Sequence, residues 1–358
     1  MSYLKNAWYC AGFSHELGDT PLALTVLGEL IVIYRLPDKT PVALADRCPH
    51  RFAPLSKGRV SGETLQCGYH GLQFGPDGLC RYNPHGNHAI PRNARVAAYP
   101  MVERDSLLWI WMGETSLARP EEAPDFGEFL NMSEYPTVRG SYKLDAHYEL
   151  VIDNLLDLSH GMYLHKGTLT NGEEDADRFH FDMKEDGGNI AAYHSRLNVL
   201  PAPFFKKAWT RSARVDHHSD MFWSAPSNLR HDVGIAECGR PNSEGIFLHV
   251  VHLLTPISEN ETRYCWIASR NFAFNNEAAS QALYDAINRA FTQEDEPMIA
   301  AVYQRMASTD LLSLKPILLP GDAAGVRARR VLNRLKSEEQ PQVPKNGRPA
   351  EENPIASG

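Results

Sequence analysis

Short hydrophobic runs separated by turn-forming residues dominate the first 115 positions of the chain. Runs of strand length cover Leu22–Val26, Glu29–Leu36, Val42–Ala45 and Leu107–Trp111. The segment 75–78 has proline at the second position of a turn and glycine at the fourth, which is a strong turn signal. No apolar period of helical spacing continues for long in this region. The pattern therefore predicts a small all-β domain over residues 1–115.

Helical periods become prominent in the second part of the chain. Residues 113–126 contain two prolines and a cluster of acidic residues, a composition typical of a linker. Beyond them, apolar residues recur at helical spacing over 147–165. Further helices are predicted at Glu277–Ser308 and Asp322–Ser337, and strands at 246–254 and 262–269. Residues 116–336 are therefore predicted to form an α+β domain with a central antiparallel sheet.

The charge balance argues against several classes of partner. The chain has 36 Lys and Arg against 44 Asp and Glu, a formal net charge of −8, whereas nucleic acids and anionic membranes attract basic surfaces. Its apolar runs are far shorter than the ~18 residues of a membrane span, and its first residues do not resemble a secretory signal. We therefore expect a cytoplasmic protein with neither kind of partner. Residues 337–358 contain four prolines and few large apolar side chains, so a disordered tail is expected there.

Two cysteine–histidine pairs lie close together in the first domain. Cys48 and His50 are followed by Cys67 and His70. Six cysteines scattered over 358 residues are too few for a disulfide scaffold, and in a reducing compartment such pairs more often bind metal. A [2Fe–2S] cluster can hold one iron by two thiolates and the other by two imidazoles, which matches one Cys and one His in each loop. Structural zinc is the alternative, although its common spacing pairs Cys with Cys and His with His.

A second set of candidate ligands lies in the first predicted helix of the second domain. Asn154, Asp157 and His160 recur every three residues and are expected to share one helical face. His160 and His165 lie about 140° apart around a regular helix, so they converge only if it ends or widens between them, and Gly161 is a plausible point. Two histidines and a carboxylate are the ligand set of non-haem Fe(II) enzymes that activate O₂. Histidines that merely cap or pack an amphipathic helix are the alternative.

Together these motifs resemble the catalytic subunits of the Rieske non-haem iron oxygenases, and among them the aromatic O-demethylases. The resemblance rests on segments 48–56, 83–87 and 153–157, and it extends from Lys5 to the helix near Arg330. It implies a [2Fe–2S] Rieske cluster bound by Cys48, His50, Cys67 and His70. It also implies mononuclear Fe(II) bound by His160, His165 and Asp295.

The resemblance further implies roles for side chains near the iron. The family uses the residue matching Asp157 to connect a cluster histidine of the neighbouring subunit with an iron histidine. We expect Asp157 and Asn154 to serve catalysis from this position. The carboxylate ligand matches Asp295, and its neighbours Glu294 and Glu296 would point elsewhere on a regular helix, at ~100° per residue.

The implied reaction is the O-demethylation of a methoxylated aromatic acid with O₂. Hydroxylation of the methyl group gives a hemiacetal that collapses to a phenol and formaldehyde. The chain lacks the glycine-rich fingerprint of a dinucleotide-binding fold, so electrons from NAD(P)H must arrive through a separate reductase, a ferredoxin or both. The family implies a homotrimer in which the cluster of one subunit supplies electrons to the iron of its neighbour. The alternatives are hydroxylation of another methyl or ring position, and an electron carrier without catalytic iron.

Two histidines are candidate contacts for the substrate. His249 and His252 lie on one predicted strand but on opposite faces, because side chains alternate along a strand. The resemblance favours His252 for the active-site cavity and places His231 at a polar substrate contact. A histidine in an otherwise apolar pocket can hydrogen-bond a phenolic or carboxylate group, and a satisfied core histidine is the alternative. The adjacent His217 and His218 are expected at the surface.

Overall fold

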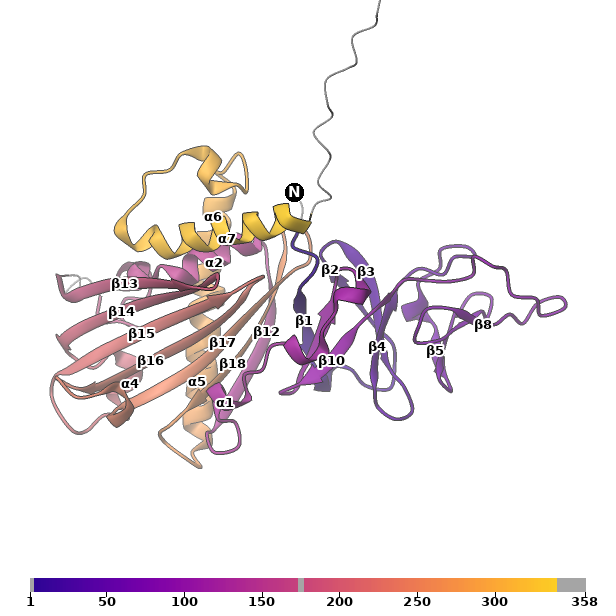
Figure 1. The fold of residues 1–358 in the computed structure, drawn as a ribbon. Coiled ribbons are helices and arrows are strands. Elements are labelled where there is room, and N and C mark those ends of the chain that lie inside the picture. The colour runs from indigo at the N-terminus through magenta and orange to yellow at the C-terminus, as the bar shows by residue number, and fades with distance from the viewer. Residues whose placement is uncertain (1–2, 173–176, 340–358) are drawn as a thin grey trace, which may run out of the picture.

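A β-rich part lies beside a larger sheet covered by helices in the computed structural model, which describes residues 3–172 and 177–339 (Figure 1). The β-rich part contains sheets with the strand orders β1-β11-β10, β2-β3-β4-β9 and β5-β6-β7-β8. Its strands are β1 (Trp8–Phe13), β2 (Leu22–Val26), β3 (Glu29–Arg35), β4 (Pro41–Ala45), β5 (Arg59–Ser61), β6 (Thr64–Gln66), β7 (Gln73–Phe74), β8 (Cys80–Tyr82), β9 (Ala98–Tyr99), β10 (Met101–Arg104) and β11 (Leu107–Trp111). The predicted all-β character of this part is confirmed.

Strand β3 shows why this part needs two cores. It lies between β2 and β4, and its residues from Ile31 to Tyr34 are fully buried. Because side chains alternate along a strand, Ile31 and Ile33 pack into the main core of the molecule. Val32 and Tyr34 pack into a second core, which also contains the two cysteines of the predicted cluster site. The strand therefore ties the cluster loops to the rest of the protein.

The larger part is built on a seven-stranded antiparallel sheet in the order β12-β18-β17-β16-β15-β14-β13, as the described residues have it. Its strands are β12 (Thr137–Leu144), β13 (Phe179–Asp186), β14 (Asn189–Val199), β15 (Val215–Ser224), β16 (Asn228–Glu237), β17 (Ile246–Pro256) and β18 (Thr262–Arg270). The predicted central antiparallel sheet is therefore present, and the strands expected at 246–254 and 262–269 are β17 and β18.

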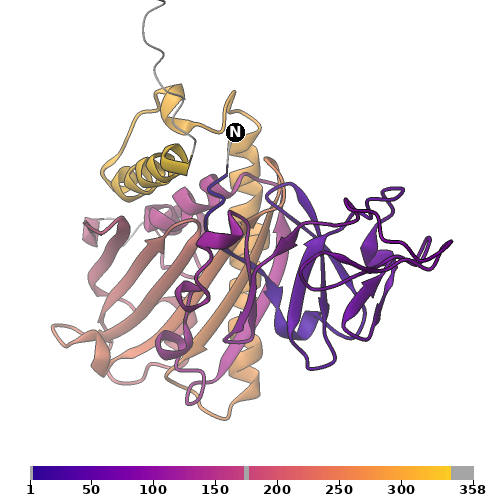
Figure 2. The same cartoon turned by 45° about the vertical axis from the view of Figure 1, so that its right-hand side comes forward.

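Helices of the larger part pack against this sheet (Figure 2). They are α1 (Gly127–Leu130), α2 (Tyr148–Leu156), α3 (Gly161–Leu164), α4 (Pro203–Lys206), α5 (Glu277–Arg289), α6 (Glu296–Tyr303) and α7 (Ala323–Glu339). A π-helical turn, Ala290–Asp295, joins α5 to α6, so the helix predicted from Glu277 is one rod that ends five residues early, at Tyr303. Among the described residues, no helix combines the length and the apolar character needed to cross a membrane.

Two expectations about the connecting segments need correction. The segment expected to be a linker is packed rather than free, since Ala123 and Phe126 are buried in a core that also contains Trp109 and Val251. Helix α7 runs to Glu339, three residues into the expected tail, and residues 340–358 lie outside the described residues. The expected domain boundary near residue 115 stays a prediction.

Candidate metal centres and substrate cavity

Two loops with the same backbone pattern carry the cysteine–histidine pairs. In the first loop, the Cys48 N–H donates to the Ala53 carbonyl (2.9 Å) and the Phe52 N–H donates back to the Cys48 carbonyl (2.9 Å). In the second loop, the Cys67 N–H donates to the carbonyl five residues on (2.8 Å) and the Gly71 N–H donates back to Cys67 (3.1 Å). The fifth residue of each loop has a positive φ, 59° at Phe52 and 75° at Gly71. The two loops are therefore near-equivalent turns.

The two near-equivalent turns bring ligands of the same type together. The thiols of Cys48 and Cys67 are buried and close enough to hydrogen-bond each other, and burial raises the pKa of Cys48 to about 11. The rings of His50 and His70 lie nearer the surface, with centroids 4.5 Å apart. Two thiols inside and two imidazoles outside fit a [2Fe–2S] cluster that has one iron on each pair.

The second ligand group forms where helix α2 ends. The helix stops at Leu156, Asp157 is extended (φ −117°, ψ 91°), and a 3₁₀ turn over Leu158–His160 leads into α3. The shared helical face expected for Asn154, Asp157 and His160 is therefore wrong, because the helix breaks before two of them. The break precedes His160 and does not lie at Gly161, whose φ of −57° is helical.

The new chain direction lets the two histidines converge with a distant carboxylate. One ligand atom each from His160, His165 and Asp295 lie within 4.8 Å of one another. Asp295 Oδ1 is 3.4 Å from His160 Nε2 and 3.3 Å from His165 Nε2. Burial raises the pKa of Asp295, but the hydrogen bonds and charges of the two histidines outweigh burial and lower it to about 2. This set of donors fits a mononuclear iron.

Neighbouring groups hold these ligands in place. The Nδ1–H of His160 donates to the backbone carbonyl of Asp157 (2.6 Å), which leaves the lone pair of Nε2 available to bind a metal. The Asp157 carboxylate accepts the Ser159 N–H (3.0 Å) and so stabilises the turn. Asn154 Nδ2 donates to Asp295 Oδ1 (3.2 Å). Asp157 and Asn154, the two residues predicted to serve catalysis, therefore both contact the ligand group, Asp157 through its backbone carbonyl and Asn154 through its amide.

Glu294 also lies at this group. The expectation that it points elsewhere assumed a regular α-helix, and the π-helical turn changes it. Glu294 Oε2 is 2.7 Å from Nδ1 of His165, on the side of the ring opposite to Asp295. Glu296 begins α6 and hydrogen-bonds the backbone of Asp145 instead.

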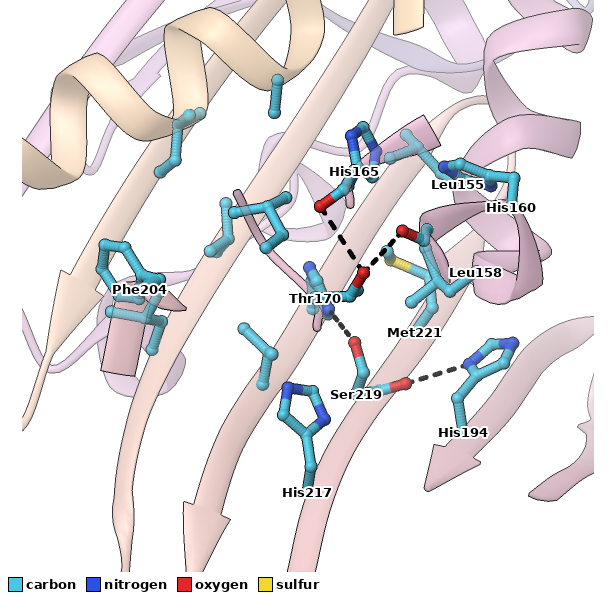
Figure 3. A pocket seen from close by; sticks show the side chains of 18 of the residues that line it. Leu155, Leu158, His160, His165, Thr170, His194, Phe204, His217, Ser219 and Met221 are labelled. Carbon is cyan, nitrogen blue, oxygen red and sulfur yellow. Dashed lines mark hydrogen bonds between the residues drawn. The ribbon is translucent and has the colours of Figure 1, made fainter. Parts of the chain in front are cut away.

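A cavity of about 150 Å³ opens directly beside the ligand group, between the sheet and the helices (Figure 3). Residues of α2, α3, the π-helical turn and strands β14–β17 all line it. Its apolar wall is formed by Leu155, Leu158, Met162, Phe204, Phe205, Met221, Val233, Leu248, Val250, Leu283, Ile287 and Phe291. Cavities of this volume can hold one benzene-sized ring.

His252 faces this cavity from β17. Its side chain is buried, its Nδ1 is 2.6 Å from the Tyr264 hydroxyl, and its Nε2 has no hydrogen-bond partner among the described residues. His249 lies on the other face of the sheet, next to the backbone carbonyl of Phe129. Burial lowers the pKa of His252 to about 3, so its ring is neutral.

His231 lines the cavity next to His252. The two ring centroids are 5.7 Å apart, and His231 Nε2 is 2.8 Å from the hydroxyl of Ser219. Burial lowers the pKa of His231 well below its usual value, and the neighbouring His252 lowers it further. Both candidate substrate contacts therefore offer neutral imidazoles.

Sequence analysis missed a second row of polar residues on β14 and β15. The expectation that His217 and His218 lie at the surface is wrong, because both side chains are buried. Helices cover one face of β15, and on the other face His218 contacts the carboxylate of Asp232 on the neighbouring strand. His217, Arg196 and His194 all line the cavity. The Arg196 guanidinium donates to the ring of His217 (3.0 Å). Figure 3 shows His194 and Ser219 on adjacent strands, joined by a hydrogen bond. The alternation of polar residues along these strands was the available signal.

Comparison with known proteins adds a family to this geometry. Residues 7–100 match the Rieske [2Fe-2S] domain family, and residues 144–338 match the vanillate O-demethylase oxygenase C-terminal domain family. The chain is 37% identical to the dicamba O-demethylase oxygenase component of Stenotrophomonas maltophilia, over 95% of this chain and 99% of that one. It is 34% identical to the chloroacetanilide N-alkylformylase oxygenase component of Rhizorhabdus wittichii, over 95% and 98%. The crystal structure of dicamba monooxygenase bound to dicamba superposes with a TM-score of 0.86 at 35% identity, over 95% and 99% of the two chains.

Proposed function

This chain belongs to the Rieske non-haem iron oxygenases with a C-terminal domain of the vanillate O-demethylase type, and from that premise we propose that it O-demethylates a methoxylated aromatic acid. It is the oxygenase component of a multicomponent system, with a [2Fe–2S] cluster and mononuclear iron as cofactors. A reductase or ferredoxin component is its redox partner. The observation that carries the proposal is one cavity lined both by the ligand group and by His252, a buried histidine whose Nε2 has no hydrogen-bond partner among the described residues.

The ligands follow from the donor sets. The thiolates of Cys48 and Cys67 hold one iron of the cluster, and the imidazoles of His50 and His70 hold the other. The mononuclear iron is held by His160, His165 and Asp295, and when bound it supplies the activation of O₂. Overall, the methyl ether, O₂, NAD(P)H and a proton give a phenol, formaldehyde, water and NAD(P)⁺.

The cavity binds and orients the aromatic ring. Its apolar wall gives an aromatic ring a surface to pack against, and its few polar groups can fix the direction of the ring. The Tyr264 hydroxyl can donate to Nδ1 of His252, and the Nε2–H is then the donor that this lining residue has free for a ligand. A carboxylate or phenolic oxygen on the ring accepts this bond, which holds the methoxy carbon near the ligand group. His231 lies beside it as the second contact.

Electron supply from a neighbouring subunit fits the shape of the chain. In Figures 1 and 2 the small sheet that contains β5 and β8, and whose strands β6 and β7 are joined by the loop with Cys67 and His70, lies at the far end of the molecule from β14–β16, which line the cavity. An electron that stayed within one subunit would have to pass from that end of the molecule into the larger part, to the end of α2 and the turn between α5 and α6. We therefore place this chain in a homotrimer, with Asp157 at the contact between the cluster of one subunit and the iron ligand His160 of the next.

Oxidation of a different methyl group is the second candidate function. It is favoured by the chloroacetanilide N-alkylformylase component, which is almost as similar to this chain as the dicamba enzyme component is. An N-alkyl substrate would use the same ligand group and the same apolar wall. It would not need a hydrogen-bond donor for a carboxylate at His252.

A panel of matched substrates separates these reactions. The purified chain, a compatible reductase, NADH and O₂ are incubated with matched aromatic compounds that carry a methoxy, an N-methyl or a ring methyl group, each with and without a carboxylate. We expect one formaldehyde per methoxylated acid consumed, and little turnover of the uncharged methyl ethers. Turnover of only N-methyl or ring-methyl compounds would contradict the proposal. An iron content of about two per chain, the cluster alone, would instead indicate an electron carrier.

A further inference from the structure

Two consecutive carboxylates contact the two nitrogens of one imidazole in the ligand group. Asp295 Oδ1 is 3.3 Å from Nε2 of His165, and Glu294 Oε2 is 2.7 Å from Nδ1 of the same ring. Both acids are largely buried, with 4% and 13% of their side chains exposed. His165 is therefore held between Asp295, which belongs to the same ligand group, and Glu294, which does not.

The π-helical turn makes this arrangement possible. Successive side chains of an α-helix diverge by about 100°, which would send Glu294 away from a ring that Asp295 faces. A π-helical turn is wider, because its hydrogen bonds close five residues apart, so successive side chains diverge less. The longer Glu294 side chain can then pass around the ring to its far nitrogen.

Glu294 is itself fixed by groups from two other segments. The Thr168 hydroxyl, in the loop after α3, lies 3.1 Å from the same Oε2. Arg289, five residues earlier at the end of α5, has its Nε 3.3 Å from Oε1. The spacing of five is that of a π-helical turn, so the turn places Arg289 and Glu294 on one side of the rod. The carboxylate thus has a defined position and a partner for its charge.

We propose that Glu294 is a positioning residue for the mononuclear iron: it accepts the Nδ1–H of His165, which keeps the lone pair of Nε2 directed at the metal. A carboxylate in this position also makes the imidazole a stronger donor. The inference rests on the ligand group of the proposed function, and it adds a residue that does not itself bind the metal. It gives the π-helical turn a purpose, namely to place one carboxylate on each side of His165.

Replacing the carboxylate tests this role through metal affinity. In E294M the acceptor is lost. We expect the affinity of the mononuclear site for Fe(II), measured on the assembled protein with its cluster in place by competition with a chelator, to fall roughly 10- to 100-fold. In E294Q the amide oxygen can still accept the Nδ1–H, so the loss should be smaller than in E294M. The visible spectrum of the Rieske cluster should be unchanged in both variants. The neighbouring acid provides a matched control, because E296Q should bind Fe(II) as the wild type does.

Each other outcome has a definite meaning. If E294M binds Fe(II) as tightly as the wild type, or E294Q binds as weakly as E294M, the proposed hydrogen bond has no role. The variant H160A separates this result from a failure of the ligand assignment. If H160A loses Fe(II) while E294M keeps it, only the proposal for Glu294 is overturned. If H160A also keeps Fe(II), the ligand group itself is wrong.

Discussion

At the scale of single residues, an unpaired nitrogen makes His252 the candidate contact for the substrate. His252 offers the unpaired Nε2, while His249, three residues earlier, faces the other side of the sheet. Substituting His252 by Ala removes the hydrogen bond to the substrate and leaves the ligand group intact. We expect KM for a methoxylated acid to rise about 10-fold or more, since hydrogen bonds to charged groups contribute about 1.5–3 kcal/mol. Steady-state kinetics with iron analysis measures this.

The comparison at the same strand provides the control. His249→Ala changes an imidazole on the outer face, so KM should stay near that of the wild type. An unchanged KM in His252→Ala would remove this residue from the binding site. A parallel loss of iron would show that its role is structural.

The cluster ligands also allow a test at the residue scale. Replacing His70 by Cys exchanges a neutral imidazole for a thiolate, which adds negative charge and stabilises the oxidised cluster. We expect a [2Fe–2S] centre to remain, with its reduction potential lower by roughly 100 mV or more, because all-cysteine clusters lie several hundred mV below many Rieske centres. A redox titration followed by visible absorption measures the shift. An unchanged potential would exclude His70 as a ligand.

At the scale of elements, the break after α2 places a charge where the chain changes direction. The carboxylate of Asp157 accepts the Ser159 N–H, and its backbone carbonyl accepts the Nδ1–H of His160. Asp157→Asn keeps an oxygen for the first bond and the whole of the second, but removes the charge. We expect both metals to be retained and most of the turnover to be lost, because the cluster can no longer reduce the neighbouring iron efficiently. Stopped-flow oxidation of the reduced cluster measures this step directly.

An exposed acid at the start of the same region is the matched control. Asp145 lies before α2 and is exposed, so the reduced cluster of the Asp145→Asn variant should be oxidised at the wild-type rate. Wild-type kinetics in Asp157→Asn with full iron content would contradict the electron-transfer role. Loss of iron in that variant would assign Asp157 to the fold of the turn.

Two basic side chains of α7 form ion pairs with α2: the buried Arg329, and Lys336, whose Nζ is 2.6 Å from Glu149 Oε1. The guanidinium of Arg329 makes a bidentate contact with Asp153 (2.7–3.0 Å) and donates to Glu149 (2.7 Å), and its side chain is 3% exposed. Asp153 directly precedes Asn154, the partner of the ligand Asp295. This contact therefore supports the end of α2 from which the ligand group is built.

Removing that arginine should cost much more than removing its neighbour. Arg329→Met leaves Asp153 without its guanidinium partner and Glu149 with Lys336 alone, so we expect the free energy of unfolding to fall by roughly 3 kcal/mol. Arg327→Met, on the same helix, breaks a half-exposed pair with Glu185, and the expected loss is below about 1 kcal/mol. Urea unfolding curves measure both losses. Equal losses in the two variants would contradict a special role for Arg329.

At the scale of the whole molecule, buried neutral histidines make stability depend on pH. Burial, aided by Arg329 and Lys336, outweighs Glu149 and lowers the pKa of His147 from 6.5 to about 4. Between these two values the unfolded chain binds a proton that the folded chain does not. Stability therefore falls as the pH drops from 6.5 to 4, by up to about 1.4 kcal/mol per pH unit for each such histidine.

The contribution of His147 can be isolated. We expect the urea midpoint of the wild type to decrease clearly between pH 7 and pH 5. In His147→Asn, which cannot titrate, the decrease should be smaller by the share of this one residue. The same decrease in both proteins would show that His147 does not carry the effect.

The sequence by itself determined the strand pattern of the N-terminal part and the residue types that it offers as ligands. Alternating hydrophobic runs predict strands because one face or both must be buried. The pairs Cys48/His50 and Cys67/His70 indicate a cluster because ligand type and short spacing are local properties. The resemblance also predicted Asp295 as the third iron ligand, and the structure brings its carboxylate within 4.8 Å of the two histidines.

Only the tertiary structure decided how the distant pieces meet. The direction of the chain at Asp157, where the predicted helix breaks, and the π-helical turn at Ala290–Asp295 both depend on packing between elements that local periodicity does not report. The burial of His217 depends in the same way on helices that cover β15. Alternation predicted that His249 and His252 face opposite sides of the sheet, but which side holds the cavity depends on where the helices pack. Side-chain period is a local property, whereas burial is a property of the assembled fold.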